Sequence, residues 1–169
     1  MSATLLWSDA LALGLDAMDE THREFIVLLA QVDHAGDTDL LPAWQQVVDH
    51  TQDHFDREDQ WMRNTRFSSS NCHSMQHQVV LQVMREVASR VQITGDMAML
   101  RDMSLQLGQW FLHHAQSMDA ALALHLRNTG FDPLTGLVSM PDALPTDLIH
   151  GCGGSSCGST AEAVTGATA

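Results

Sequence analysis

Basic residues are scarce in this chain of 169 residues, which carries eight arginines, no lysine and 21 acidic residues. The formal net charge is −13, and no basic patch or stripe is present that would bind nucleic acid or an anionic membrane. Long apolar runs are missing as well, so no segment is expected to insert into a membrane. The N-terminus lacks a basic leader, and Asp9 and Asp16 interrupt its apolar run, so we expect no signal peptide.

Cysteine is also rare. The three cysteines are an odd number, and none is expected to pair across the folded part of the chain. We expect Cys72 to be structural and Cys152 and Cys157 to be idle thiols, with a redox pair or a transient metal site as the alternative for the last two. A cytoplasmic, reducing location fits this pattern best.

Apolar residues at helical spacing dominate the first 130 residues, after an irregular arm. They predict four helices, which run from the N-cap Asp16 to about Gly36, from Thr38 or Asp39 to about Asn64, from a polar break at 68–71 to about Thr94, where Gly95 ends the helix, and from Asp96 to Asn128-Thr129-Gly130. Pro42 is expected in the first turn of the second helix, where proline is tolerated. No stretch shows sustained alternation with glycine-rich turns, so no sheet is expected. Four long helices with short connections predict an all-α fold, an up-down-up-down antiparallel four-helix bundle.

Three parts are therefore expected: an N-terminal arm at 1–17, the bundle at 18–130 and a C-terminal tail at 131–169. The last residues are almost all Gly, Ser, Ala and Thr. Such a composition cannot bury enough apolar surface to offset its ordering entropy, so the sequence predicts a flexible tail.

Histidines and acidic residues recur at spacings that suit metal binding. The candidates are spread over all four predicted helices: His22, His54, Glu58, His73, His77, His114 and Asp119. In two pairs, His54/Glu58 and His73/His77, the members are four residues apart and so share one face of a helix. Imidazole and carboxylate ligands without cysteine are typical of non-haem iron, zinc or manganese. Such a site in the centre of a bundle is built from side chains on facing helices.

Spacing alone leaves some members of this set open. His114 and Asp119 are five residues apart, about 140° on an α-helix, so a shared ion is not implied. His113 is an alternative to His114, and periodicity does not decide between them. His50 lies one turn before His54 and is by spacing as good a ligand as Glu58, although a solvated histidine, or one that only contacts a ligand, is the favoured interpretation.

Four motifs together resemble those of one known family. They are Trp7-Ser8-Asp9 with Gly14 and Asp19-Glu20-Thr21-His22, then His54-Phe55-Asp56-Arg57-Glu58, then His73-x-x-x-His77, and last Trp110-x-x-x-His114 followed by Asp119. Over about residues 7–126, the motifs, their order and their separations are similar to those of the bacterial hemerythrins, histidine-rich di-iron proteins that bind oxygen.

The resemblance implies a ligand set. It implies that His114 rather than His113 is a ligand and that Glu58 and Asp119 bridge two iron ions. One iron would carry His73, His77 and His114, and the other His22 and His54. A single oxo or hydroxo group would link the two irons.

A count of coordination positions then predicts function. Five imidazoles, two bridging carboxylates and the oxygen bridge fill eleven of about twelve positions of two six-coordinate ions, so one stays open. The resemblance places the open position on the two-histidine iron, where dioxygen would bind. We expect reversible dioxygen binding for carriage, storage or delivery, without enzymatic activity. Nitric oxide and small anions are further expected ligands.

Three other functions compete with this one. The same centre would serve a sensor of oxygen, nitric oxide or redox state, with a protein partner bound through the tail. It would also serve a di-iron peroxidase or a nitric oxide scavenger. A structural zinc bundle is disfavoured because seven ligands exceed the needs of one tetrahedral ion. The absence of any Glu-x-x-His pair argues against iron storage or a hydroxylase.

Departures from the family pattern carry predictions of their own. Ala115 stands where the family commonly has a bulkier aliphatic residue, and Phe111 stands where an aliphatic residue is usual. We expect Ala115 to leave a more open route to the vacant position. Asp59 replaces a second glutamate and is expected to face solvent.

Overall fold

The computed structural model describes residues 5–67 and 72–147, and these residues form helices joined by short connections. The elements after a short 3-10 turn at Asp9–Leu11 are α1 (Asp16–His34), α2 (Asp37–Asn64), α3 (Cys72–Thr94), α4 (Met97–His114), the π-helical segment η2 (Ala115–Asp119), α5 (Ala120–Thr129) and a 3-10 turn at Pro141–Ala143. No strand is present in the described ranges, which contain only an isolated bridge between Phe131 and Val138. The predicted all-α class is confirmed.

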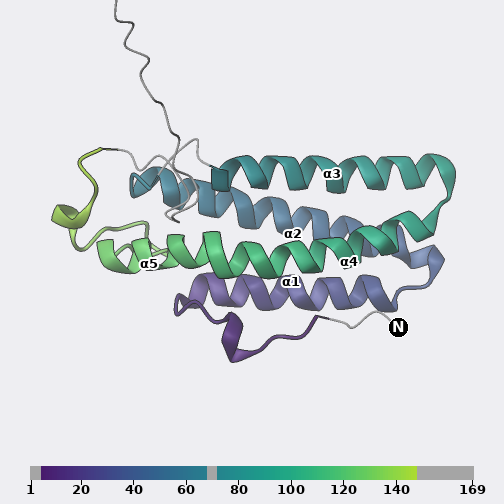
Figure 1. Cartoon of the computed structure of the whole chain (residues 1–169), viewed down its shortest axis with the longest axis horizontal. Helices are drawn as coiled ribbons and strands as arrows, with labels where there is room; N and C mark the ends of the chain where they lie inside the picture. The colour runs from purple at the N-terminus through teal and green to yellow at the C-terminus, as the bar shows by residue number, and fades with distance from the viewer. Residues whose placement is uncertain (1–4, 68–71, 148–169) are drawn as a thin grey trace, which may run out of the picture.

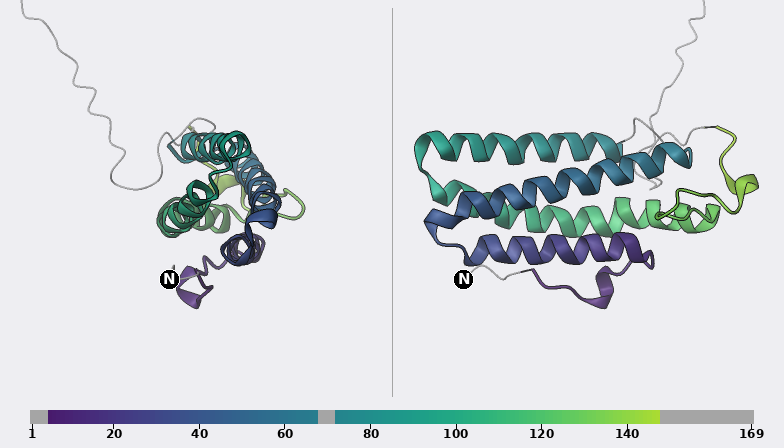
Figure 2. Two further views of the ribbon diagram at one scale, coloured as in Figure 1. Left: turned by 90° about the vertical axis from the view of Figure 1, so that its right-hand side faces the viewer. Right: turned by 180° about the vertical axis from the view of Figure 1, so that it is seen from behind.

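The long helices lie side by side as an antiparallel bundle (Figure 1). α1 packs against α2, α2 against α3 and α3 against α4, and α4 closes the ring against α1. Figure 2 shows the arrangement along the bundle axis, with η2 and α5 continuing the direction of α4. The connections at 35–36 and 95–96 are only two residues long, so the helices that each of them joins run antiparallel. No helix of the described residues is both long and apolar enough to cross a membrane.

Two helix starts differ from the sequence-based expectation. α2 begins at Asp37, before Thr38 and Asp39, and Gly36 precedes it without a side-chain cap. Pro42 therefore lies in the second turn of α2 rather than the first. α1 begins at Asp16, which was expected to be its N-cap.

A buried carboxylate binds the backbone at the end of the N-terminal arm. Asp19 accepts hydrogen bonds from the backbone N–H groups of Leu13, at 2.7 Å, and Gly14, at 3.1 Å. Gly14 adopts φ +71°, a conformation that other residues rarely take. Arg127 of α5 donates to the Leu13 carbonyl. These contacts attach the arm to α1 and α5.

The polar candidates divide the apolar core into two clusters. The larger cluster includes Phe25, Phe55 and Phe111, and the smaller one is built from Met18, Trp61, Met62, Phe67, Leu122, Ala123, Leu126 and Phe131. α1, α2 and the continuous segment α4–η2–α5 each contribute residues to both clusters. On each of them, the candidate ligands lie where the larger cluster gives way to the smaller one. Packed apolar layers on both sides hold the ligand-bearing turns of the helices in place.

The segment after α5 folds back on the end of the bundle. Gly130 ends α5 at φ +60°, and the Phe131 N–H bonds to the Leu126 carbonyl at 2.9 Å. Phe131, where the sequence places the start of the flexible tail, is buried in the smaller cluster. The polar break at 68–71 and residues 148–169, with Cys152 and Cys157, lie outside the described residues.

Candidate metal centre

The structure brings all seven sequence-predicted candidates together at mid-bundle, and each is at least 96% buried. His22 comes from α1, His54 and Glu58 from α2, His73 and His77 from α3, His114 from the end of α4 and Asp119 from the end of η2. The alternative His113 is exposed. Burial therefore favours His114 where spacing could not decide.

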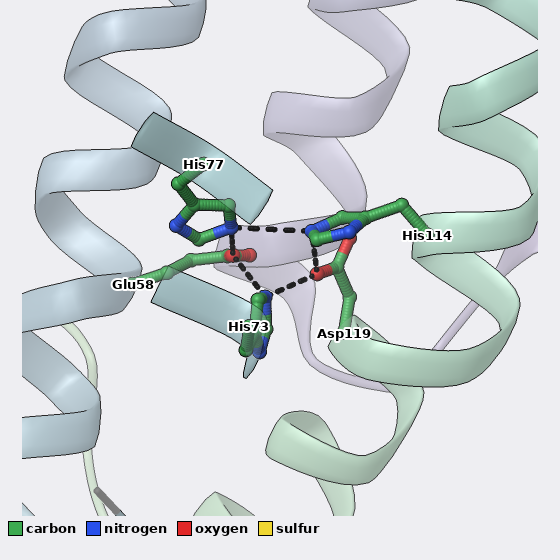
Figure 3. A group of neighbouring side chains, drawn as sticks. All are labelled: Glu58, His73, His77, His114 and Asp119. Atoms are coloured by element: carbon green, nitrogen blue, oxygen red, sulfur yellow. Dashed lines mark hydrogen bonds and ion pairs between the residues drawn. The ribbon is translucent and has the colours of Figure 1, made fainter. Parts of the chain in front are cut away.

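Three histidines and both carboxylates form the first group of ligand atoms. The group consists of Glu58, His73, His77, His114 and Asp119, with one ligand atom from each within 4.8 Å of all the others. The Nε2 atoms of His73 and His114 lie 3.0 and 3.1 Å from Asp119 Oδ1. The Nε2 atoms of His73 and His77 each lie 3.4 Å from Glu58 Oε2. Figure 3 shows these side chains converging from three sides on one point.

The second group shares both carboxylates with the first. It consists of His22, His54, Glu58 and Asp119. His54 Nε2 lies 2.9 Å from Glu58 Oε1, and His22 Nε2 lies 3.2 Å from Asp119 Oδ2. Each carboxylate therefore turns one oxygen toward each group of histidines.

Several of these atoms have no hydrogen-bond partner although they are fully buried. The unpartnered atoms are Nε2 of His22 and His73, Oε2 of Glu58 and both carboxylate oxygens of Asp119. An unpartnered buried polar group costs about 1–3 kcal/mol, and such groups are rare in folded proteins. Nitrogen and oxygen atoms that converge without hydrogen-bonding geometry fit a bound cation, so this donor set fits a metal ion.

A π-helical segment explains how Asp119 reaches His114. In η2 the backbone N–H of Ala120 bonds to the carbonyl of Ala115, five residues earlier. Widening the helix in this way brings residues five apart to neighbouring turns on one side, whereas an α-helix separates them by about 140°. Sequence analysis missed this segment, because no residue type marks a π-helix.

In the metal-free chain, the two buried carboxylates and the surrounding histidines shift one another's pKa values. Burial and mutual repulsion favour their neutral forms, but the surrounding histidines hold the pKa of both Glu58 and Asp119 well below the usual range. Burial lowers the pKa of His73, yet the adjacent carboxylates of Asp119 and Glu58 raise it to about 10. The two buried anions therefore attract cations, whether protons on histidine or metal ions.

Two ligand candidates have partners on their outer ring nitrogens. His77 Nδ1 donates to Asp59 Oδ1 at 3.1 Å, and His114 Nδ1 donates to the Gln76 side-chain carbonyl at 3.3 Å. Asp59, expected to face solvent, has a side chain that is 21% exposed, and its Oδ1 also contacts His77. The position of Asp59 next to Glu58 in the sequence does not predict that its side chain contacts His77. No feature of the sequence indicated the contact of Gln76 with His114.

Aromatic rings pack directly against three of the candidate histidine ligands. Phe55 stacks on His77, with ring centroids 3.8 Å apart and an interplanar angle of 5°. Trp110 stacks on His114 at 4.4 Å, and Phe111 meets the ring of His22 edge-on at 5.1 Å. These contacts limit the rotation of the imidazoles.

Two further sequence candidates lie at the margin of the centre. His50 is half-buried, and its Nε2 lies 3.1 Å from the Glu24 carboxylate rather than in either ligand group. Cys72, beside His73, is disulfide-bonded, so the expectation of an unpaired structural cysteine was wrong. The partner of Cys72 lies outside the described residues.

Comparisons with known proteins agree with the geometry. Residues 13–124 match the family model described as the hemerythrin HHE cation binding domain. A bacteriohemerythrin of Ralstonia nicotianae is 37% identical over 126 residues, which are 75% of this chain and 91% of the relative. Bacteriohemerythrins of Stenotrophomonas maltophilia and Pseudomonas aeruginosa are 29% and 22% identical, over 72% and 75% of this chain and 80% and 84% of their own lengths. No solved structure gives a significant match. The matched segment includes all seven residues of the cluster, and the chain belongs to the hemerythrin family.

Proposed function

We propose that this chain binds dioxygen reversibly at a non-haem di-iron centre, for carriage, storage or delivery of oxygen. The supporting observation is the division of each carboxylate between the two groups of histidines. Glu58 and Asp119 each offer one oxygen to either side, which is the arrangement that two bridged metal ions need. A single ion would leave half of these oxygens unused.

The proposed ligands divide unequally between the two ions. His73, His77 and His114 hold one iron, and His22 and His54 hold the other. With both carboxylates and one oxygen bridge, the three histidines would complete six positions on one iron, and the two histidines would leave one position open on the other. Ferrous iron bound there supplies the electrons for reversible binding of dioxygen at the open position.

The protein around the two-histidine side protects that position from water. His22 is fully buried and lies against Phe111, and Phe111 packs against Phe25 with ring centroids 4.7 Å apart and ring planes tilted by 35°. An apolar lining excludes the water and protons that would oxidise the irons irreversibly. This feature supports oxygen binding rather than turnover, so we propose that the protein is not an enzyme. Nitric oxide and small anions are proposed to compete for the same position.

The cytoplasmic location stays a prediction from the sequence, and the disulfide at Cys72 argues against a reducing compartment. A protein partner bound through residues 131–169 also stays a prediction, since the structure describes only the first part of that segment.

Metal analysis combined with optical spectra tests the proposed function. The purified chain is loaded anaerobically with ferrous iron, freed of excess metal and cycled between air and vacuum. We expect two irons per chain and a visible absorption that appears with oxygen and fades without it. Colour that persists under vacuum together with peroxide consumption would favour the peroxidase, and a chain that holds no iron pair would refute the centre.

A further inference from the structure

Among the described residues, Asp59 is the only charged side chain outside the ligand groups that forms an ion pair with a proposed ligand. Its Oδ1 lies 3.1 Å from His77 Nδ1, on the side of the ring that faces away from the other ligands. A carboxylate accepts but does not donate, so His77 carries a proton on Nδ1. The neutral ring is then unprotonated at Nε2, the atom directed at Glu58 and His114.

Three of the other proposed histidine ligands lack such a partner. His114 donates its Nδ1 proton to a neutral amide, that of Gln76. The Nδ1 atoms of His22 and His73 are buried without a hydrogen-bond partner. An anionic partner therefore distinguishes His77 from His22, His73 and His114.

The surroundings of Asp59 offer its carboxylate no ion-pair partner that competes with His77 among the described residues. Asp59 and His77 both line a surface cleft of about 450 Å³ between α2 and α3, so the outer side of the carboxylate is open to solvent. Arg85, the cationic residue of the same cleft, bonds to Gln52. Among the described residues, His77 is the only ion-pair partner of Asp59. The ring itself is fixed between this carboxylate on its edge and Phe55 on its face.

We propose that Asp59 is a positioning residue that orients His77 and increases the electron donation of its Nε2 to the bound iron. A carboxylate on the outer nitrogen of a metal-bound histidine fixes the ring and raises its basicity. A more basic ligand stabilises the higher charge of oxidised iron, so Asp59 lowers the reduction potential of the three-histidine iron. The proposal rests on the di-iron centre proposed above and assigns its two halves different electronic surroundings.

Three variants test this role. Asp59→Asn removes the charge and keeps a hydrogen-bond acceptor, whereas Asp59→Ala removes both. Asp56→Asn is the matched control, because Asp56 is exposed on α2 and lines the same cleft, and the ion pair of His77 in that cleft is with Asp59 instead. Each variant and the wild-type chain are measured by ring-nitrogen NMR without metal, then by the rate of iron loss to a chelator and by the reduction potential after loading.

The expected results separate the two variants of Asp59. With Asp59→Ala, the Nδ1–H signal of His77 shifts toward that of a free imidazole and iron is lost about tenfold faster. With Asp59→Asn, the signal is partly retained and the reduction potential rises. Asp56→Asn leaves the NMR signal, the release rate and the potential as in the wild type.

Two outcomes overturn the proposal. One is an Asp59→Ala variant that keeps the wild-type ring signal, iron release and potential. The other is an Asp56→Asn variant that shifts the potential as much as Asp59→Asn, since the effect would then be that of any nearby charge. A wild-type chain that holds no iron pair refutes the proposed function instead, and the NMR measurement on the metal-free chain still decides whether Asp59 holds His77.

Discussion

Asp119 follows His114 by five residues, yet its Oδ1 lies 3.1 Å from the His114 Nε2. An α-helix would direct the two side chains about 140° apart. The π-helical segment between them removes this separation, and it lies where the continuous segment α4–η2–α5 contributes both a histidine and a carboxylate to the buried cluster. π-Segments are rare and recur at functional sites, which is the pattern seen in this bundle.

The adjacent histidines His113 and His114 provide a direct test of the ligand assignment. His114→Ala removes a buried ring that faces both Asp119 and His77, so we expect the loaded protein to lose at least one of its two irons. His113→Ala changes an exposed side chain and should leave the iron content at two per chain. Iron is measured per chain after anaerobic loading and desalting. Equal iron content in the two variants would contradict the assignment of His114.

Titration of His73 predicts how the metal-free chain responds to alkali. The pKa of His73 is raised from 6.5 to about 10 by Asp119 and Glu58, against the effect of burial. The resulting stabilisation is fully present below pH 6.5 and is lost as the pH rises through about 10. We expect the free energy of unfolding to fall over this range by at most about 1.4 kcal/mol per pH unit.

Composition makes this measurement unusually clean. The chain contains no lysine and no tyrosine, so these two side chains, which normally titrate near pH 10, do not contribute. Urea unfolding of the metal-free protein at several pH values measures the slope, and His73→Gln is the control that should flatten it. A wild-type slope that persists in His73→Gln would show that another group is responsible.

Much of the fold and of the centre could be predicted from the sequence, for identifiable reasons. Helix ends at Gly95 and Gly130 were predictable because both glycines adopt positive φ at the end of an apolar periodic segment. The pairs His54/Glu58 and His73/His77 were predictable because four residues make about one turn of an α-helix. Both inferences use local geometry that regular helices obey.

The unpredicted features depend on irregular backbone or on tertiary contact. The π-helical segment has no residue signature, so only the family resemblance could favour Asp119. The contact of Asp59 with His77 joins two helices, and its existence depends on how α2 and α3 pack. The burial of Phe131 likewise depends on a turn that returns to the bundle end rather than on local composition.

Phe55 is expected to matter for the metal as well as for stability. Phe55→Leu removes the ring that stacks on His77 at 3.8 Å, so His77 gains freedom to rotate and iron should be lost to a chelator several-fold faster. The smaller side chain should also cost about 1–2 kcal/mol of unfolding free energy. Rates of iron loss and urea unfolding measure the two effects.

A second phenylalanine separates these effects. Phe67 is as buried as Phe55 but lies in the smaller core cluster, away from the ligand groups. Phe67→Leu should cost similar stability while leaving the rate of iron loss unchanged. Equal acceleration by both variants would mean that general destabilisation, and not the ring on His77, governs iron retention.

Ala115 tests whether packing beside the centre controls access to the open position. It is fully buried at the start of η2, one residue after His114 and one helical turn after Phe111, which touches His22. Ala115→Ile adds bulk there, so we expect slower autoxidation of the oxygenated protein and slower binding of azide, at a cost of about 1–3 kcal/mol of stability. Ala123→Ile is the matched control, because Ala123 is equally buried in the smaller cluster and its change should lower stability without slowing either reaction. Stopped-flow spectra record azide binding, and the decay of the oxygenated absorption in air records autoxidation. Rates in Ala115→Ile equal to those of the wild type would show that small molecules reach the irons by another route, whatever the change in stability.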